Sequence, residues 1–236
     1  MRRRDFLHSA GLALAPLLVP GLQRRAPLRI ALLHPPASGS AALAAALDGA
    51  RLGIEEASHT YTLLGRALDA FETTDAGARA CALVTLIDEP ALSTLPSGAL
   101  AVDARARFAC DAARSAFRIG VAETPEPVVL WHPSLERFGA TQLNDRFARR
   151  FGRDMDEHAW AAWFALKVVA EAGLRAPSPG AAALAGWLDG SAARFDGHKG
   201  RPLWFDAERR LVQPIYRQLA DGLETLNPEE AVACAS

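Results

Sequence analysis

Polar side chains able to bind a small molecule follow three apolar runs of the sequence, at the points where those runs end. In a parallel α/β sheet, ligands bind beyond the carboxyl ends of the strands, where helix N-termini present free N–H groups. Serine hydroxyls at such an edge can donate to a carboxylate or hydroxyl group of a solute, although simple capping of the next helix is the alternative role for each serine. The candidate ligand-binding residues are Ser38, Ser40, Asp88 and Asp103.

Catalysis has little support in the sequence. There is no G-x-S-x-G elbow, no Walker loop, no G-x-G-x-x-G after the first strand and no H-E-x-x-H. Ser38 and Asp88 follow strands and His34 lies in a turn, but nothing in their spacing fixes the geometry of a triad. We therefore predict a protein that is not an enzyme and has no catalytic residue. The alternative, a hydrolytic enzyme, requires a substrate-dependent activity that is lost when Ser38 or His34 becomes Ala.

Metal and cofactor sites are not expected either. Acidic side chains at the start of a helix are favoured by the helix dipole, which accounts for one cluster that could in principle hold a metal ion. The sequence has no paired C-x-x-C motif, so zinc and redox chemistry have little support. The acidic cluster consists of Asp154, Asp156, Glu157 and His158.

The elements that must position the candidate residues alternate between strands and helices. The apolar run Leu28–Leu33, broken only by Arg29, predicts a strand buried on both faces. A helix should follow, because Leu43, Leu47, Ala50 and Ile54 fall on one face. This alternation predicts an α/β fold with a doubly wound, mainly parallel sheet. Further strands are expected at Tyr61–Leu68, Ala82–Ile87, Ala99–Val102, Phe117–Ala122 and Val128–Trp131, with a short helix at Ala76–Ala80.

The second half of the chain reads as three helices and a set of short strands. Ser134 is expected to cap the first helix, and Asp156 a buried helix that stops at Gly173. That buried helix, Glu157–Ala172, is apolar nearly all round. A short helix is expected at Ala181–Leu188, and short strands at Phe195–Lys199, Leu203–Phe205 and Val212–Arg217.

Residues 1–26 are predicted to be an export signal. Three arginines at positions 2–4 precede Phe6 and Leu7, and the apolar run Ala10–Val19 is too short to span a bilayer. The Arg-Arg-x-Phe-Leu pattern resembles the twin-arginine signals that carry folded proteins across the bacterial inner membrane. An ordinary secretory signal, or a basic start before a core helix, stays open. We expect residues 27–222 to form one periplasmic domain and residues 223–236 a flexible tail.

The net charge limits which binding partners are expected, and the cysteine content limits which disulfides are possible. The formal net charge of −1 gives no electrostatic reason to expect nucleic acid or an anionic membrane as a partner. In an oxidising compartment Cys81 and Cys110 could pair and leave Cys234 free. Because Cys81 opens an apolar strand, a buried thiol is equally compatible with the sequence.

Three segments together resemble one family. The first strand runs into Pro36-Ala-Ser-Gly39, as in the opening strand and turn of type I periplasmic solute-binding proteins of ABC transporters, the branched-chain amino-acid-binding kind. The helix Trp163–Ala172 is similar to a late helix of that family, with Trp163 and Phe164 in place of its usual Tyr and Asp. The segment Phe195–Gly200 and the stretch that follows it to Tyr216 resemble the family's closing segment, which is the most specific of the three.

A narrower resemblance points to one branch of this family. The branch accompanies alcohol oxidation that depends on pyrroloquinoline quinone. The resemblance implies a small-molecule ligand and, as partner, an ABC permease or a periplasmic dehydrogenase system. The residues that carry it are Trp131-His132, Gly139–Asn144, Arg146-Phe147, Gly152-Arg153, Met155 and Ala161–Trp163, with Cys110-Asp111 less securely.

The sequence departs from the family in length. It passes from the fifth expected strand at Ala122 almost directly to Val128, so most of the second lobe, which in the family closes over the ligand, has no counterpart. A degenerate protein that no longer transports and acts as a scaffold or interaction partner is therefore the main alternative. A homodimer that covers the face left by the missing lobe is also open, with Trp131 as a candidate contact.

Overall fold

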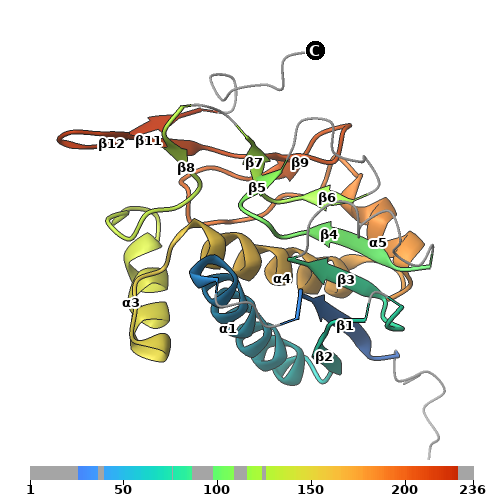
Figure 1. The fold of residues 1–236 in the computed structure, drawn as a ribbon. Coiled ribbons are helices and arrows are strands. Elements are labelled where there is room, and N and C mark those ends of the chain that lie inside the picture. The colour runs from blue at the N-terminus through green and yellow to red at the C-terminus, as the bar shows by residue number, and fades with distance from the viewer. Residues whose placement is uncertain are drawn as a thin grey trace, which may run out of the picture.

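A five-stranded sheet with strand order β2-β1-β3-β4-β6 forms the centre of the protein (Figure 1). The computed structural model describes residues 26–36, 40–75, 77–86, 98–108, 116–123 and 126–227. Every neighbouring pair in this sheet is parallel, and the order reverses between β1 and β3, which confirms the expected mainly parallel α/β fold. The strands are β1 Leu28–Leu33, β2 Leu68–Thr73, β3 Ala82–Thr85, β4 Leu100–Asp103 and β6 Phe117–Arg118.

The central strands are buried on both faces. All residues of β3 are buried, and in β1 only Arg29 is exposed, where its Nε donates to Asp69 Oδ2 of β2 at 2.9 Å. Near-continuous apolar runs of this kind belong to strands covered on both faces. The prediction for Leu28–Leu33 is therefore confirmed, including its single polar interruption.

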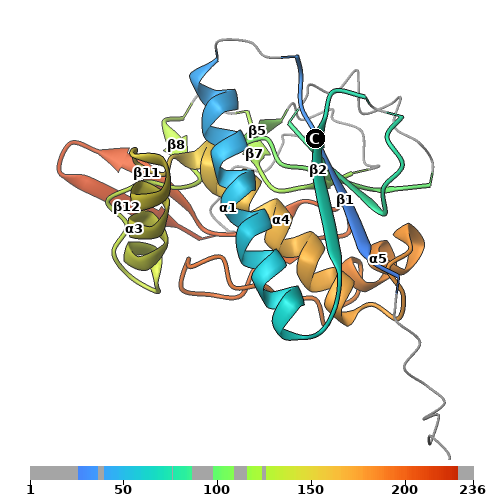
Figure 2. The same cartoon turned by 90° about the horizontal axis from the view of Figure 1, so that it is seen from below.

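Two long helices pack side by side and lie against the sheet (Figure 2). Helix α1 spans Ala41–Leu63 and helix α4 spans Glu157–Arg175. Glycine lets their backbones approach closely, since a Cβ atom on Gly49 would lie 1.9 Å from the carbonyl oxygen of Ala159. A Cβ on Gly53 would lie 2.8 Å from the side chain of Leu166 in the same way. The core of the lobe thus closes through a contact between backbones.

The predicted strand at Tyr61–Leu68 is wrong, because α1 continues to Leu63. Tyr61 is buried on the face of α1 that meets α4, and its hydroxyl donates to the carbonyl of Ala170 at 2.9 Å. Gly65 follows the end of the helix, and its φ of 63° is the left-handed conformation typical of the residue after a helix C-terminus. Arg66 N donates to Tyr61 O at 2.8 Å and closes this last turn.

Three further expectations fail for local reasons. Residues 77–80 form no helix, because the carboxylate of Asp75 binds the N–H of Gly77 in a turn. Ser134 caps no helix, since its hydroxyl bonds to His132 Nδ1 and α3 starts later, at Ala140. The segment 195–199 forms no strand, but a single bridge joins Phe195 to Leu203.

The other predicted helices are confirmed. Asp156 caps α4 by accepting from Ala159 N at 2.9 Å, and the helix runs slightly past Gly173, to Arg175. Helix α5 spans Ala181–Leu188 as expected, and α3 spans Ala140–Phe151. No helix in the described part of the chain is long and apolar enough to cross a membrane.

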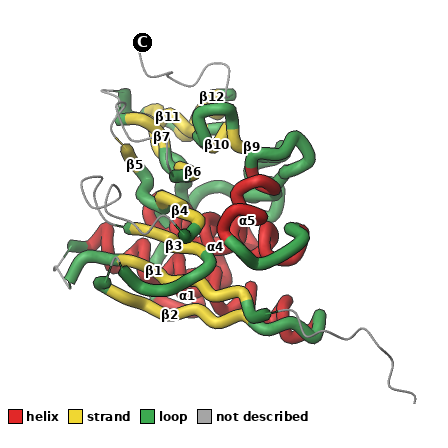
Figure 3. The backbone as a smooth tube through the Cα atoms, turned by 90° about the vertical axis from the view of Figure 1, so that its right-hand side faces the viewer, coloured by secondary structure: helices red, strands yellow, loops and turns green. Residues whose placement is uncertain are grey.

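Three small sheets lie on the β6 side of the five-stranded sheet (Figure 3). A three-stranded antiparallel sheet has the order β12-β11-β8, and two further sheets have two strands each. Residues 223–226, expected in a flexible tail, instead lie in β12, which pairs with β11. The strands are β5 Arg107–Phe108, β7 Val121–Ala122, β8 Val128–Val129, β9 Trp204–Phe205, β10 Leu211–Val212, β11 Ile215–Leu219 and β12 Gly222–Leu226.

Trp131, which follows β8, is buried. It is only 2% exposed, its indole N–H donates to Asn144 Oδ1 at 2.8 Å, and its ring stacks on Trp160 of α4. A buried Trp with a satisfied N–H cannot serve as a surface contact, so the suggestion that it meets a second copy of the chain is wrong.

Candidate functional site

The carboxyl edge of the five-stranded sheet is the place where this topology offers a ligand site. The strand order reverses between β1 and β3, and crevices at such switch points are the usual binding sites of open parallel sheets. Ser40 follows β1, and Asp103 ends β4 on the far side of β3, so the fold brings both to this edge. The other two predicted ligand residues, Ser38 and Asp88, lie outside the described residues.

Ser40 occupies the N-cap of α1. Its hydroxyl oxygen accepts a hydrogen bond from Leu43 N at 3.3 Å, and its side chain is exposed. The long bond leaves the hydroxyl hydrogen free to be donated elsewhere, because a cap uses only the acceptor function of the oxygen. Capping and ligand contact are therefore compatible roles for this serine.

Asp103 is held by a neighbouring arginine. Its carboxylate is 1% exposed and accepts from Arg105 Nε at 2.9 Å and from an Arg105 terminal nitrogen at 2.7 Å. Such a bidentate pair fixes the guanidinium in one orientation. The Asp103 carboxylate is therefore already paired, at the end of β4, with the Arg105 guanidinium that it orients.

His34 lies beside a second charged pair at the end of β1. Its Nδ1 is 2.8 Å from the carbonyl of Pro35, and its Nε2 is 4.0 Å from a carboxylate oxygen of Glu72. Arg51 donates two hydrogen bonds to Glu72, at 2.8 and 3.0 Å, and this bonding lowers the pKa of the Glu72 carboxyl. His34 therefore contacts Pro35 and Glu72, and these contacts favour a structural role for it.

A polar junction joins α4 to the small sheets, and sequence reasoning missed it. Arg107 of β5 donates to Glu157 Oε2 at 2.9 Å and also bonds to the carbonyl of Val128. The same Glu157 oxygen accepts from Leu130 N at 2.9 Å. Glu157, expected only as part of an acidic helix start, instead ties three segments together.

Lys199 is the buried cation of this junction. Its Nζ donates to Gln213 Oε1 at 2.7 Å and to the carbonyl of Pro214 at 3.0 Å, and lies 3.9 Å from the ring centroid of Trp160. Burial lowers the pKa of this ammonium well below its usual value, against the opposing attraction of Glu157. Gln213 in turn donates to Ile119 O at 2.6 Å. No periodicity marks a lysine in a core, so no sequence pattern could have found it.

The structure gathers no metal-binding group in the ranges it describes, where no three His, Cys, Asp or Glu side chains come together. Asp156 and Glu157 of the acidic cluster are bonded to Ala159 N and Arg107. Cys81 is a free thiol, partly buried, at the start of β3. Its suggested partner Cys110 and the third cysteine, Cys234, lie outside the described residues.

The fold is shared with solved solute-binding proteins. An ABC-type branched-chain amino acid transporter from Rhodopseudomonas palustris superposes with a TM-score of 0.68 at 14% identity, covering 88% of this chain and 98% of that one. A leucine-, isoleucine-, valine-, threonine- and alanine-binding protein from Brucella ovis, in its closed conformation, gives 0.66 at 9% identity over 89% and 99%. An R. palustris ABC solute-binding protein in complex with benzoate gives 0.60 at 14% identity over 89% and 98%.

No protein-family profile matches the sequence, and no curated protein matches it in sequence. Superposition on solved structures of such low sequence identity shows a shared fold and leaves the function open. The fold that the sequence resemblance implied, that of type I periplasmic binding proteins, is thereby confirmed.

Proposed function

We propose that this chain is a periplasmic solute-binding component of an ABC transporter and binds a small solute at the carboxyl edge of its five-stranded sheet. The observation that carries the proposal is the strand order with its switch point between β1 and β3, in a fold shared with solute-binding proteins. An export signal at residues 1–26, of the twin-arginine kind, would deliver the protein to the periplasm. The partner in transport is then an ABC permease.

The proposed contacts come from the loops that follow β1, β3 and β4. Ser38, Ser40 and Asp88 supply hydroxyl and carboxylate groups, and the free N–H groups at the start of α1 add donors. Asp103 acts through Arg105, whose guanidinium it orients by two hydrogen bonds. A donor-rich edge of this kind suits a solute that carries a carboxylate or a hydroxyl group.

The solute class is proposed on two grounds. Of the proteins with the same fold, one is named for binding leucine, isoleucine, valine, threonine and alanine and another was solved in complex with benzoate, and all of these ligands carry a carboxylate. The narrower sequence resemblance favours a place in alcohol metabolism that depends on a quinone cofactor, with a periplasmic dehydrogenase system nearby. Alcohols, amino acids, short carboxylates and the quinone cofactor are therefore the solutes to test.

A thermal-shift screen of the purified protein against these four classes tests the proposal. A ligand that binds only the folded state raises the melting temperature in proportion to the logarithm of its excess over the dissociation constant. We expect a saturable rise for one class, reduced in Ser38→Ala and unchanged in the control Ser178→Ala, an exposed serine between α4 and α5. A well-folded protein that responds to no class would overturn the proposal.

A second function is favoured by one observation. The reduced second lobe leaves little to close over a ligand, and the Asp103 carboxylate is already occupied by Arg105. A scaffold that binds a permease or dehydrogenase, without a small ligand, would retain the lobe for its surface alone. Pull-down of such a partner by a protein that shows no thermal shift would support the scaffold.

A further inference from the structure

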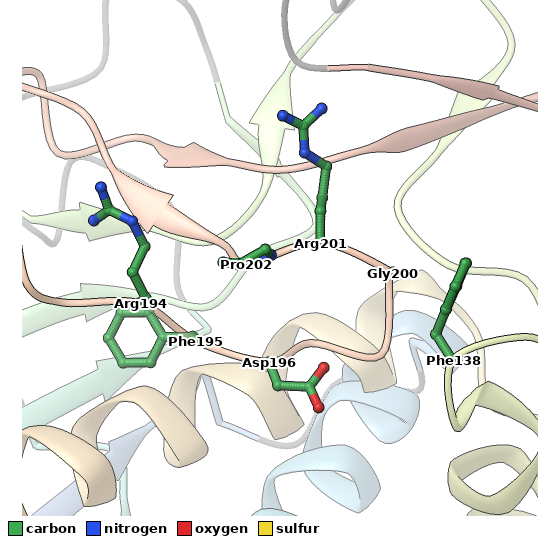
Figure 4. A pocket seen from close by; sticks show the side chains of 7 residues that line it. All are labelled: Phe138, Arg194, Phe195, Asp196, Gly200, Arg201 and Pro202. Atoms are coloured by element: carbon green, nitrogen blue, oxygen red, sulfur yellow. The ribbon is translucent and has the colours of Figure 1, made fainter.

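An open hollow lies between the turn before α3 and the loop that leads into β9 (Figure 4). Its volume is about 450 Å³, within the range of about 300–1,000 Å³ typical of small-molecule sites. None of the four ligand residues predicted from the sequence lines it. The lining residues are Phe138, Arg194, Phe195, Asp196, Gly200, Arg201 and Pro202.

Two guanidinium groups rise from the same side of this loop (Figure 4). Arg194 bonds to the carbonyl of Ala193 at 2.8 Å and lies over the ring of Trp204, and no acidic side chain in the described residues pairs with it. Arg201 donates to Asn227 Oδ1 at 3.3 Å, which holds its head at the rim. Guanidinium forks placed this way suit a carboxylate, which they bind by charge-assisted hydrogen bonds.

The acidic residue of the hollow, Asp196, faces away from both arginines. In Figure 4 the carboxylate of Asp196 points to the side opposite the two arginines. Its Oδ1 accepts from the N–H of His198 at 2.8 Å, so it serves the turn of its own loop. Arg194 therefore meets no acidic side chain of the hollow.

Phe138 presents an exposed aromatic ring at the side of the hollow, and its backbone is strained. Phe138 is 64% exposed, and its φ of 58° is a conformation that bulky residues rarely adopt. His198 has a similar φ of 59°, and its Nδ1 bonds to the carbonyl of Phe138 at 3.1 Å, which fixes the two loops to each other. Strained, over-determined backbone of this kind is concentrated at binding sites.

The floor of the hollow is rigid and apolar. Phe195 is 2% exposed and packs edge-to-face against Phe164, Trp187 and Phe205. The ring of Phe138 lies against the backbone of Gly200, where a Cβ atom would come within 2.4 Å of it. A ligand in the hollow would thus meet apolar surface below, one aromatic face at the side and two cations at the rim.

From this arrangement we propose that the hollow binds a small aromatic carboxylate, separately from the solute site at the carboxyl edge. The carboxylate is held by Arg194 and Arg201, and the aromatic body lies between Phe138 and the floor formed by Phe195 and Pro202. Each side of the hollow then meets the matching part of one molecule. The site is independent of the transport function proposed above.

Calorimetric titration of the full-length protein with phenylacetate tests this site. A ligand of this size in an open hollow should bind with a dissociation constant of about 0.1–5 mM. Phenylacetamide, which has the ring without the charge, and acetate, which has the charge without the ring, should each bind at least about tenfold more weakly. Equal affinity for all three compounds would overturn the proposal.

Two variants assign the binding to the hollow. Arg194→Gln should weaken phenylacetate at least about tenfold, because it removes the charge, and Phe138→Asn about threefold, because Asn tolerates the left-handed backbone but has no ring. The control Arg149→Gln changes an exposed arginine of α3 outside the hollow and should bind as the wild type does.

The outcomes separate this site from the carboxyl edge. Phenylacetate binding that survives both variants, or that is abolished by Ser38→Ala, would place the ligand at the edge and overturn the assignment to the hollow. No saturable binding to a folded wild-type protein would overturn it as well. A thermal shift with another solute that persists in Arg194→Gln would leave the proposed transport function standing.

Discussion

The five-stranded lobe and the junction beneath the small sheets are held together by different forces. In the lobe, α1 and α4 meet through glycine backbones and buried apolar side chains, and two hydrogen bonds cross between them, from Tyr61 to Ala170 and from Trp163 to Glu56. At the junction, Lys199, Glu157 and Arg107 tie α4 to segments far along the chain by charge and hydrogen bonds. Apolar contacts do not titrate, whereas buried charges do. Between pH 7 and 9.5, where Glu72 stays ionised and Tyr61 stays neutral, the lobe should contribute little to the pH dependence of stability, and buried Lys199 at the junction should dominate it.

Gly49→Ala should cause the largest loss of stability, because the new methyl group has no room against the Ala159 carbonyl. Separating two packed helix backbones should cost at least about 3 kcal/mol in the free energy of unfolding. Urea denaturation measures this loss. The control is Gly186→Ala in α5, where a Cβ meets nothing within 4 Å, and it should stabilise by about 0.5–1 kcal/mol. Equal effects of the two substitutions would show that the helices do not pack as closely as described.

Glu157→Gln should break the junction at a smaller cost. The amide keeps an acceptor for Leu130 N but loses the charge that faces Arg107, whose side chain is 27% exposed. We expect a loss of about 1–2 kcal/mol, below that of a fully buried pair because solvent screens this one in part. The matched control, Glu55→Gln, breaks the exposed pair with Arg150 and should have a smaller effect that salt suppresses. A junction effect that salt suppresses equally would contradict its burial.

Lys199→Met should change the pH dependence of stability. Burial lowers the pKa of the folded-state ammonium, so below the ordinary lysine pKa the unfolded state binds more protons than the folded state. Wild-type stability should therefore rise with pH between 7 and 9.5, by at most about 1.4 kcal/mol per pH unit more than that of the variant.

Two tyrosines limit this measurement on the alkaline side. Burial raises the pKa of Tyr61 and of Tyr216 to about 12, so their contribution is complete below the ordinary tyrosine pKa and is lost as the pH rises toward 12. Denaturation of both proteins at pH values up to 9.5 avoids that range. Parallel pH profiles for wild type and variant would contradict an ionisable Lys199 buried at the junction.

Ser40→Ala should produce the smallest change, at the edge of the lobe. Loss of a single helix cap costs about 0.5–1 kcal/mol, toward the lower value here because the bond to Leu43 N is 3.3 Å long. Ser40→Asp retains a capping oxygen and should keep wild-type stability in thermal denaturation. If Ser40→Asp loses as much stability as Ser40→Ala, the hydroxyl has a role beyond capping.

Sequence patterns predicted the elements whose burial follows a simple rule. Leu28–Leu33 and Ala181–Leu188 were located correctly because an uninterrupted apolar run and a short apolar helix leave few alternatives. Tyr61–Leu68 was misread as a strand, because contact with α4 keeps its first residues helical. Tertiary contacts commonly override local preference in this way.

The location of the candidate site could be predicted from the sequence, but its side-chain contacts could not. The switch-point edge follows from the order of strands, and Ser40 lies there as expected. The pairing of Asp103 with Arg105 depends on side-chain geometry, and the hollow depends on Phe138 and Arg194, which are far apart in sequence. No spacing rule connects such residues before the chain is folded.

The contact between α1 and α4 also governs the order in which the chain can mature. The Tyr61 hydroxyl reaches Ala170 across 109 positions, so the first helix lacks the helix it packs against most until translation has passed α4. Until then the ribosome carries an N-terminal half with an exposed apolar face, which is a target for chaperones and a risk for aggregation. Export before folding would carry this exposed half across the membrane, whereas a pathway that accepts finished proteins, as the predicted twin-arginine signal implies, would let the whole core assemble first.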